Sequence, residues 1–164
     1  MLDQFNHIKG FIFDIDGVLT DGQIYVVEGQ IPFRAMNIKD GYALQHAVKK
    51  GYPIIVISGG NSEAAKIRLE RLGIEEVFIS IQNKVELLEG LAKMNAWDLS
   101  EFVYMGDDIP DLEAMQVCGY RACPKDAVEE IKAVATFIST KDGGKGCVRE
   151  LIEKVLKVQG NWLP

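Results

Sequence analysis

The sequence predicts a three-layer α/β fold, in which helices cover both faces of a parallel sheet. Short apolar runs that are typical of buried strands alternate along the chain with segments of helical periodicity. Acidic residues and glycines directly follow some of these runs, first at Asp14-Ile15-Asp16-Gly17. Because open α/β sheets bind ligands at the carboxyl ends of their strands, we expect a Rossmann-like sheet whose functional edge lies there.

The elements follow one another in a regular order. The apolar runs predict strands over residues 9–15, 53–58, 76–79, 102–106, 119–122 and 136–139. The helical patterns predict helices near residues 40–50, 62–72, 84–94, 109–118, 126–134 and 147–158. Asp40 is the predicted N-cap of the first helix, and Gly51 and Gly73 lie just beyond the predicted ends of the first two.

Residues 23–37 interrupt this alternation directly after the first acidic loop. They predict a β-hairpin of two short strands around the turn Glu28-Gly29-Gln30. The hairpin is rich in apolar side chains: Ile24, Tyr25, Val26, Val27, Ile31 and Phe33. A surface hairpin without a partner is one interpretation, but such an apolar surface is prone to association, so we expect neighbouring subunits to cover it.

Composition and charge exclude several classes of partner. The 164 residues carry 18 Lys and Arg against 24 Asp and Glu, a net charge of −6, so no broad basic surface attracts nucleic acid or anionic membranes. No apolar run approaches the roughly 20 residues of a membrane span, and the N-terminus lacks the pattern of a signal peptide. Cys118, Cys123 and Cys147 lack metal-ligand spacing and are expected as buried free thiols. We therefore expect a single cytoplasmic domain over residues 1–164.

Four motifs at predicted strand ends or helix starts carry the candidate chemistry. Two carboxylates at the end of a buried strand are costly unless they bind a cation or react. A serine with two glycine amides can face an anion at a helix start, although a structural turn is the alternative interpretation. A lysine at a helix start is unfavourable unless an anion neutralises it, and N-capping does not explain three carboxylates in one loop. The motifs are Asp14-x-Asp16-Gly17, Ser58-Gly59-Gly60, Lys84 and Gly106-Asp107-Asp108-x-x-Asp111.

This ordered set resembles the motifs of the haloacid dehalogenase-like phosphatase superfamily. The resemblance implies that Asp14 is the nucleophile and Asp16 the general acid and base. It also implies that Ser58, Gly59 and Lys84 bind the phosphate oxygens. An ionised carboxylate needs no partner base to attack phosphorus, and a second carboxyl group can protonate the leaving sugar oxygen and then activate water.

The same resemblance implies a magnesium ion. Its ligands would be the carboxylates of Asp14 and Asp107 and the backbone carbonyl of Asp16. Asp108 and Asp111 are similar to supporting groups that orient the lysine or metal-bound water. Magnesium and the lysine would reduce the repulsion between the nucleophile and the phosphate dianion.

The spacing of the motifs leaves no room for an inserted cap domain. The capless pattern, together with residues 37–42 and 141–150, resembles the family of 3-deoxy-D-manno-octulosonate 8-phosphate phosphatases, tetrameric enzymes of lipopolysaccharide sugar synthesis. This resemblance implies a small phosphorylated sugar acid as substrate and a homotetramer in which the hairpin of one subunit covers a neighbour's site. The tail over residues 159–164 would reach a neighbouring site, with fraying as the alternative.

One departure from the family leaves the substrate open. Gly60 and Asn61 stand where several relatives place an arginine, so Arg68 on the following helix is the candidate for binding a sugar carboxylate. A solvated charge on the helix surface is the alternative for Arg68. The substrate could instead be a 2-keto-3-deoxynonulosonate 9-phosphate of the sialic-acid type.

Two alternatives belong to other functional classes. The first is a non-catalytic oligomerisation domain, against which the retained cluster of carboxylates argues, because such a cluster is unfavourable without a metal. The second is a response-regulator-like phosphoacceptor, which would leave both Asp16 and the hairpin without a role.

Overall fold

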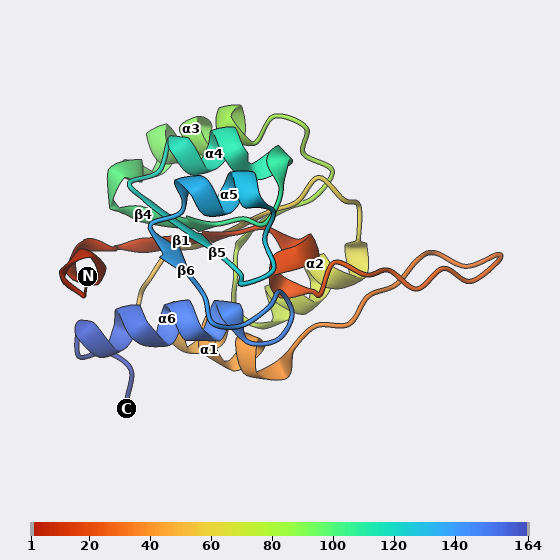
Figure 1. Cartoon of the computed structure of the whole chain (residues 1–164), viewed down its shortest axis with the longest axis horizontal. Coiled ribbons are helices and arrows are strands. Elements are labelled where there is room, and N and C mark those ends of the chain that lie inside the picture. The colour runs from red at the N-terminus through yellow and green to blue at the C-terminus, as the bar shows by residue number, and fades with distance from the viewer. Residues whose placement is uncertain (1, 164) are drawn as a thin grey trace.

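The computed structural model describes residues 2–163, and Met1 and Pro164, the last residue of the predicted tail, lie outside the described residues. Its centre is a 6-stranded sheet in the order β3-β2-β1-β4-β5-β6, with every pair of neighbours parallel (Figure 1). The six strands predicted for the sheet are confirmed, most of them shorter than expected. They are β1 (Gly10–Phe13), β2 (Ile54–Ile57), β3 (Glu76–Phe78), β4 (Phe102–Met105), β5 (Tyr120–Cys123) and β6 (Phe137–Ile138).

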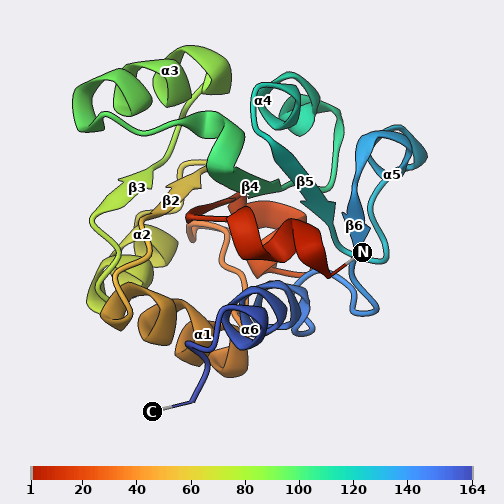
Figure 2. The same cartoon turned by 90° about the vertical axis from the view of Figure 1, so that its left-hand side faces the viewer.

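Helices cover both faces of this sheet, which confirms the predicted fold class (Figure 2). On one face lie α1 (Ile38–Lys49), α2 (Glu63–Arg71) and α6 (Cys147–Val158); on the other lie α3 (Lys84–Asn95), α4 (Leu112–Gln116) and α5 (Glu129–Val134). Single helical turns cover Asp3–His7, Leu99–Glu101 and Ile109–Asp111. Alternate residues of β1 enter different cores, since Phe11 and Phe13 pack with α1 and α6 while Ile12 packs with α3 and α4.

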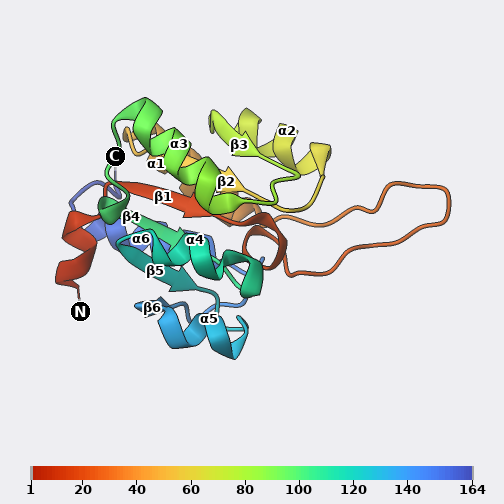
Figure 3. The same cartoon turned by 90° about the horizontal axis from the view of Figure 1, so that it is seen from above.

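The connections between strands contain no inserted domain within the described residues. The chain from β1 to β2 forms a protruding hairpin and then α1, and the chain from β2 to β3 forms α2 (Figures 1 and 3). None of the described helices is both long and apolar enough to cross a membrane. The three cysteines are buried free thiols, as expected.

The predicted hairpin is confirmed, but its two short strands are reduced to a single bridge. Between residues 23 and 37 the structure has one antiparallel bridge, in which Tyr25 N and Phe33 N donate to each other's carbonyl oxygens at 2.8 and 3.3 Å. The two rings stack with centroids 5.2 Å apart, and Gly29 forms the turn with φ of +74°. Pro32 offers no N–H donor, and an isolated ribbon with both faces in solvent gains little from burial, so the ladder does not extend.

The predicted N-cap of α1 is wrong. The Oδ1 atom of Asn37 accepts from Lys39 N at 2.8 Å and from Asp40 N at 3.2 Å, so Asn37 caps this helix. Asp40 is buried and accepts from Arg149 N at 2.9 Å, in the first turn of α6. Asn and Asp are equally good caps, so only the packing of α1 against α6 assigns the two residues to different helices.

The ends of the first two helices agree with the sequence. Gly51 and Gly73 follow α1 and α2 with φ of +88° and +96°, the left-handed conformation that ends a helix.

The C-terminal segment packs on its own chain. The Trp162 ring lies 5.3 Å from the His46 ring, and the Arg149 guanidinium lies 5.4 Å from the centre of the Trp162 ring. These contacts place the segment against α1 and α6, at the end of the molecule opposite the hairpin (Figure 1). Contact of this tail with a neighbouring subunit stays a prediction.

Candidate active site

A cavity of about 320 Å³ lies at the carboxyl ends of β1, β2 and β4. The β1 strand pairs in parallel with both β2 and β4, so the loops that leave these strands lie side by side. All four motifs found in the sequence reach this cavity. Its lining includes Asp14, Asp16, Ser58, Gly59, Lys84, Asp107, Asp108 and Asp111.

The loop after β1 holds the first pair of carboxylates. Asp14 is buried, and its Oδ1 accepts a hydrogen bond from Ile15 N at 2.8 Å. Gly17 follows in the left-handed region with φ of +84°. A Cβ atom on Gly17 would overlap the carboxylate of Asp107, so glycine is needed both for the backbone and for the close approach of the second acidic loop.

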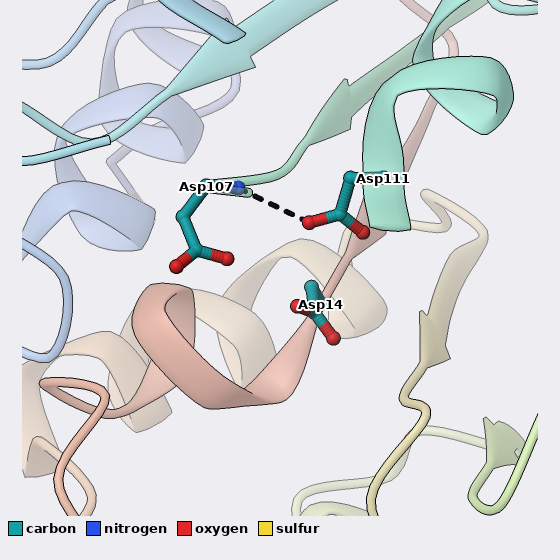
Figure 4. A group of neighbouring side chains, drawn as sticks. All are labelled: Asp14, Asp107 and Asp111. Carbon is teal, nitrogen blue, oxygen red and sulfur yellow. Dashed lines mark hydrogen bonds between the residues drawn. The ribbon is translucent and has the colours of Figure 1, made fainter. Parts of the chain in front are cut away.

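Three carboxylates from two loops converge in the cavity (Figure 4). Oxygen atoms of Asp14, Asp107 and Asp111 lie within 4.8 Å of one another. Asp111 is already bound by protein donors, since its Oδ1 accepts from Lys84 Nζ and Tyr104 OH, both at 2.7 Å, and its Oδ2 accepts from Asp107 N at 3.1 Å. Lys84 Nζ also lies 3.3 Å from Asp14 Oδ1. Asp111 therefore fixes the lysine, while the carboxylates of Asp14 and Asp107 face the cavity.

The electrostatics of this cluster favour a bound cation. Burial, followed by the carboxylate of Asp111, raises the pKa of Asp14 well above its usual value. Burial and the carboxylates of Asp111 and Asp108 raise the pKa of Asp107 to about 7. Burial lowers the pKa of Lys84, but the carboxylates of Asp111 and Asp14 outweigh it, and the net shift is upward. One ammonium group among three carboxylates leaves excess negative charge, and an all-oxygen donor set suits Mg²⁺.

The loop after β2 forms the opposite wall. Ser58 is buried, and its Oγ accepts from Gly60 N at 3.1 Å, which leaves the hydroxyl proton to donate to an anion in the cavity. A Cβ atom on Gly60 would lie 3.0 Å from Asp16 Oδ2. The glycine thus allows the Asp16 carboxylate to lie against this loop.

Comparison with known proteins agrees with this geometry. Residues 76–151 match the model of a family of haloacid dehalogenase-like hydrolases. The 3-deoxy-D-manno-octulosonate 8-phosphate phosphatase of Haemophilus influenzae is 30% identical over 160 residues, which are 98% of this chain and 89% of the relative. The chain belongs to this phosphatase family.

Solved structures of the family have the same fold. A 3-deoxy-D-manno-octulosonate 8-phosphate phosphatase from Moraxella catarrhalis, in complex with magnesium, phosphate and KDO, superposes with a TM-score of 0.93 at 36% identity, covering 98% of this chain and 92% of that one. The cobalt-bound enzyme from Haemophilus influenzae gives 0.91 at 30% identity, covering 97% and 93%. The family resemblance read from the motifs is therefore confirmed.

Two predicted site residues occupy less central positions. Asp108 is exposed at the edge of the cavity, where its Oδ1 accepts from Ile109 N at 2.7 Å. Arg68 lies outside the cavity, beside Gly41 of α1. It lines a groove of about 590 Å³ between the hairpin and α2.

Two residues at the site escaped the sequence analysis. Arg34, on the hairpin, forms an ion pair with Asp16, with Nε 2.7 Å from Oδ1. Tyr104, in the middle of β4, donates its hydroxyl to Asp111. Each had a weak signal in the sequence: a cation within an apolar hairpin, and a phenol within an otherwise apolar strand.

Proposed function

We propose that this protein hydrolyses 3-deoxy-D-manno-octulosonate 8-phosphate to 3-deoxy-D-manno-octulosonate and phosphate, as a magnesium-dependent step in lipopolysaccharide precursor synthesis. The observation that carries the proposal is the single cavity that unites Asp14, Asp16, Ser58, Lys84 and Asp107. The choice of sugar acid is supported by the Moraxella relative, whose structure holds magnesium, phosphate and KDO.

Asp14 is the proposed nucleophile. Its Oδ1 is bound by Ile15 N and lies 3.3 Å from Lys84 Nζ, so Oδ2 is the oxygen that is left to attack phosphorus. The new bond between this oxygen and phosphorus forms as the bond to the sugar oxygen breaks, which gives an aspartyl phosphate. Ser58, the Gly59 amide and Lys84 would bind the other phosphate oxygens and spread their charge.

Asp16 is the proposed general acid and base. It would give a proton to the departing sugar oxygen, and would then accept a proton from the water that hydrolyses the aspartyl phosphate. Both transfers take place at the mouth of the same cavity, since Asp16 lines it between Asp14 and the Gly60 loop.

The proposed magnesium ligands are the carboxylates of Asp14 and Asp107 and the backbone carbonyl of Asp16. A bound magnesium ion supplies the positive charge that allows a carboxylate and a phosphate dianion to approach each other. Asp111 orients Lys84 through the 2.7 Å contact, and Asp108 would orient metal-bound water from the rim of the cavity.

We also propose that residues 1–164 work as a single domain within a cytoplasmic homotetramer. The support is the exposed apolar hairpin, on which Ile31 is 87% and Val26 is 74% exposed. The hairpin and the tail over residues 159–164 would complete the site of a neighbouring subunit. Arg68, in the groove between the hairpin and α2, is the proposed partner of the sugar carboxylate.

A phosphate-release assay over a series of sugar phosphates tests the substrate. We expect magnesium-dependent turnover that is highest for 3-deoxy-D-manno-octulosonate 8-phosphate and is lost on chelation of the metal. Higher turnover of 2-keto-3-deoxynonulosonate 9-phosphate would make that compound the assigned substrate. Comparable slow turnover of every ester would refute the proposal that the protein has a dedicated substrate.

Asp14→Asn tests the reaction. The amide cannot form the acyl phosphate, so we expect phosphate release to fall by about 10³-fold or more with no change in the circular dichroism spectrum. Glu89→Gln, which removes an exposed carboxylate from α3, is the matched control and should keep full activity. Substantial activity in the Asp14 variant would remove this residue as the nucleophile.

A further inference from the structure

Arg34 reaches from the hairpin to the proposed acid and base. Its Nε lies 2.7 Å from Asp16 Oδ1, and its Nη2 donates to Asp16 Oδ2 at 3.4 Å. The Arg34 side chain is only 12% exposed, whereas the neighbouring Phe33 is 51% exposed. The hairpin thus turns this cation inward while it leaves the adjacent aromatic ring in solvent.

The contact fixes Asp16 without using all of its hydrogen-bonding capacity. Asp16 Oδ1 and Arg34 Nε are both buried, and neither has a hydrogen-bond partner among residues 2–163. Their attraction is therefore that of an ion pair, while the hydrogen bond is made through Oδ2. On its other side Asp16 Oδ2 lies against Gly60, where a Cβ atom would come within 3.0 Å. Oδ1 is thus buried against Arg34 Nε, although the Asp16 side chain is 37% exposed, so Oδ2 is the oxygen left to exchange a proton with the substrate.

We propose that Arg34 is a positioning residue that holds the Asp16 carboxyl group for proton transfer to the leaving oxygen. The inference rests on the proposed phosphatase function. In the step concerned, the bond from phosphorus to the sugar oxygen breaks, the bond from phosphorus to Asp14 forms, and the proton of the Asp16 carboxyl group passes to the sugar oxygen. Arg34 contacts Asp16 and not the substrate. It therefore acts by orienting the Asp16 carboxyl group toward the sugar oxygen.

A positioning role predicts a dependence on the leaving group. A sugar alkoxide is a poor leaving group and needs the proton, whereas p-nitrophenolate is stable enough to leave without one. Displacing Asp16 should therefore slow cleavage of a sugar phosphate much more than cleavage of p-nitrophenyl phosphate. A general disturbance of the hairpin, the metal site or the assembly would slow both.

The test compares single-turnover rates of Arg34→Gln, Arg34→Lys and wild type in the presence of Mg²⁺. With 3-deoxy-D-manno-octulosonate 8-phosphate, we expect Arg34→Gln to cleave the ester about 10- to 100-fold more slowly, a fraction of what general acid catalysis contributes. With p-nitrophenyl phosphate, release of p-nitrophenolate should change by less than about 3-fold. Arg34→Lys should recover part of the loss, since its ammonium keeps the charge but not the planar fork. Lys93→Gln, an exposed cation on α3, is the control.

The possible outcomes separate the role of Arg34 from the phosphatase function on which it rests. Equal losses on both substrates, or no loss on either, in an active enzyme would overturn the role of Arg34 and leave the phosphatase function standing. A wild-type protein that cleaves neither ester would overturn the phosphatase function and the role of Arg34 with it.

Discussion

At the scale of single residues, the two acidic loops can share one cavity because Gly17 has no side chain to keep them apart. Gly17 adopts φ of +84°, and the carboxylate of Asp107 occupies the space that a side chain on Gly17 would take. Burial, and then the carboxylates of Asp111 and Asp107 from the second loop, raise the pKa of Asp14 well above its usual value, so the approach of the two loops disfavours their ionised forms without a cation. The close contact at Gly17 and the proposed metal site are therefore two parts of one arrangement.

Gly17→Ala tests this arrangement. The added methyl group meets both a strained backbone conformation and the Asp107 carboxylate, so we expect a loss of about 2 kcal/mol or more in the free energy of unfolding. Displacement of Asp107 should also weaken magnesium binding about 10-fold or more, measured by calorimetry.

Gly90→Ala is the matched control for this variant. Gly90 lies within α3, and a Cβ atom there would meet nothing within 4 Å. The substitution should raise the free energy of unfolding by up to about 1 kcal/mol and leave magnesium binding unchanged. Unchanged magnesium affinity in the Gly17 variant would contradict the proposed role of this contact.

At the scale of elements, α6 is capped by a side chain from another helix. The buried Oδ1 of Asp40, within α1, accepts from Arg149 N at 2.9 Å, while Oδ2 has no hydrogen-bond partner among residues 2–163. Burial raises the pKa of Asp40 to about 6, although the amides of Arg149 and Gly146 and the charge of Arg149 act in the opposite direction. The helix pair thus carries a carboxylate that is costly to ionise.

The Asp40 carboxyl group makes the stability of the protein depend on pH. Its folded pKa lies above the unfolded value of 3.8, so between about pH 4 and 6 the folded state keeps a proton that the unfolded state has released. Through this group alone, the free energy of unfolding therefore falls by about 3 kcal/mol as pH rises through this window. Asp40→Asn should make the fall smaller by this amount and the protein more stable than wild type at pH 7, while Asp14 and Asp107, whose pKa values are also raised, keep their own contributions.

Denaturant unfolding of wild type and variants from pH 4 to pH 7 measures the effect. Asp98→Asn is the control, because hydrogen bonds from Ser100 lower the pKa of the exposed Asp98, so it titrates below this window. If Asp40→Asn kept the wild-type slope between pH 4 and 6, the slope would have to come from other groups.

At the scale of the whole molecule, the hairpin is the feature that a single chain does not explain, because residues 2–163 leave its apolar side chains exposed. It projects from the sheet beside the cavity, with one backbone bridge and large apolar side chains in solvent (Figure 3). Its base carries Arg34 against Asp16, so the segment that is proposed to meet other subunits also contacts the proposed acid and base. Assembly and catalysis would share this segment.

The double variant Val26→Asp, Ile31→Asp tests the assembly. Charges at two of the most exposed apolar positions of the hairpin should prevent its burial between subunits, so sedimentation should show a monomer in place of a tetramer. Met94→Asp, at an 80% exposed position on α3, should keep the assembly of the wild type. A wild-type protein that is an active monomer at assay concentration would overturn the tetramer.

Much of the fold and of the candidate site was predictable because the signals are local. Strands and helices follow from periodicity over a few residues, and the glycines after α1 and α2 end their helices through their own backbone conformations. The motifs were also visible, since Asp14, Ser58, Lys84 and Asp107 each stand at the end of a strand or the start of a helix. Parallel pairing of the strands then brings these loops together, because the carboxyl ends of all the strands lie at the same edge of the sheet.

Local signals along the chain were therefore enough to predict the α/β order, the edge of the sheet that holds the cavity and the family to which the chain belongs. Packing of the elements was needed to show that Arg34 contacts Asp16, that Asp40 caps α6, and that of the two supporting carboxylates it is Asp111 that binds Lys84. Each of these contacts joins a charged side chain to a group far away in the chain, and no residue spacing encodes such a contact. The physical reason is that a buried charge takes whichever partner the packing of the elements brings within reach.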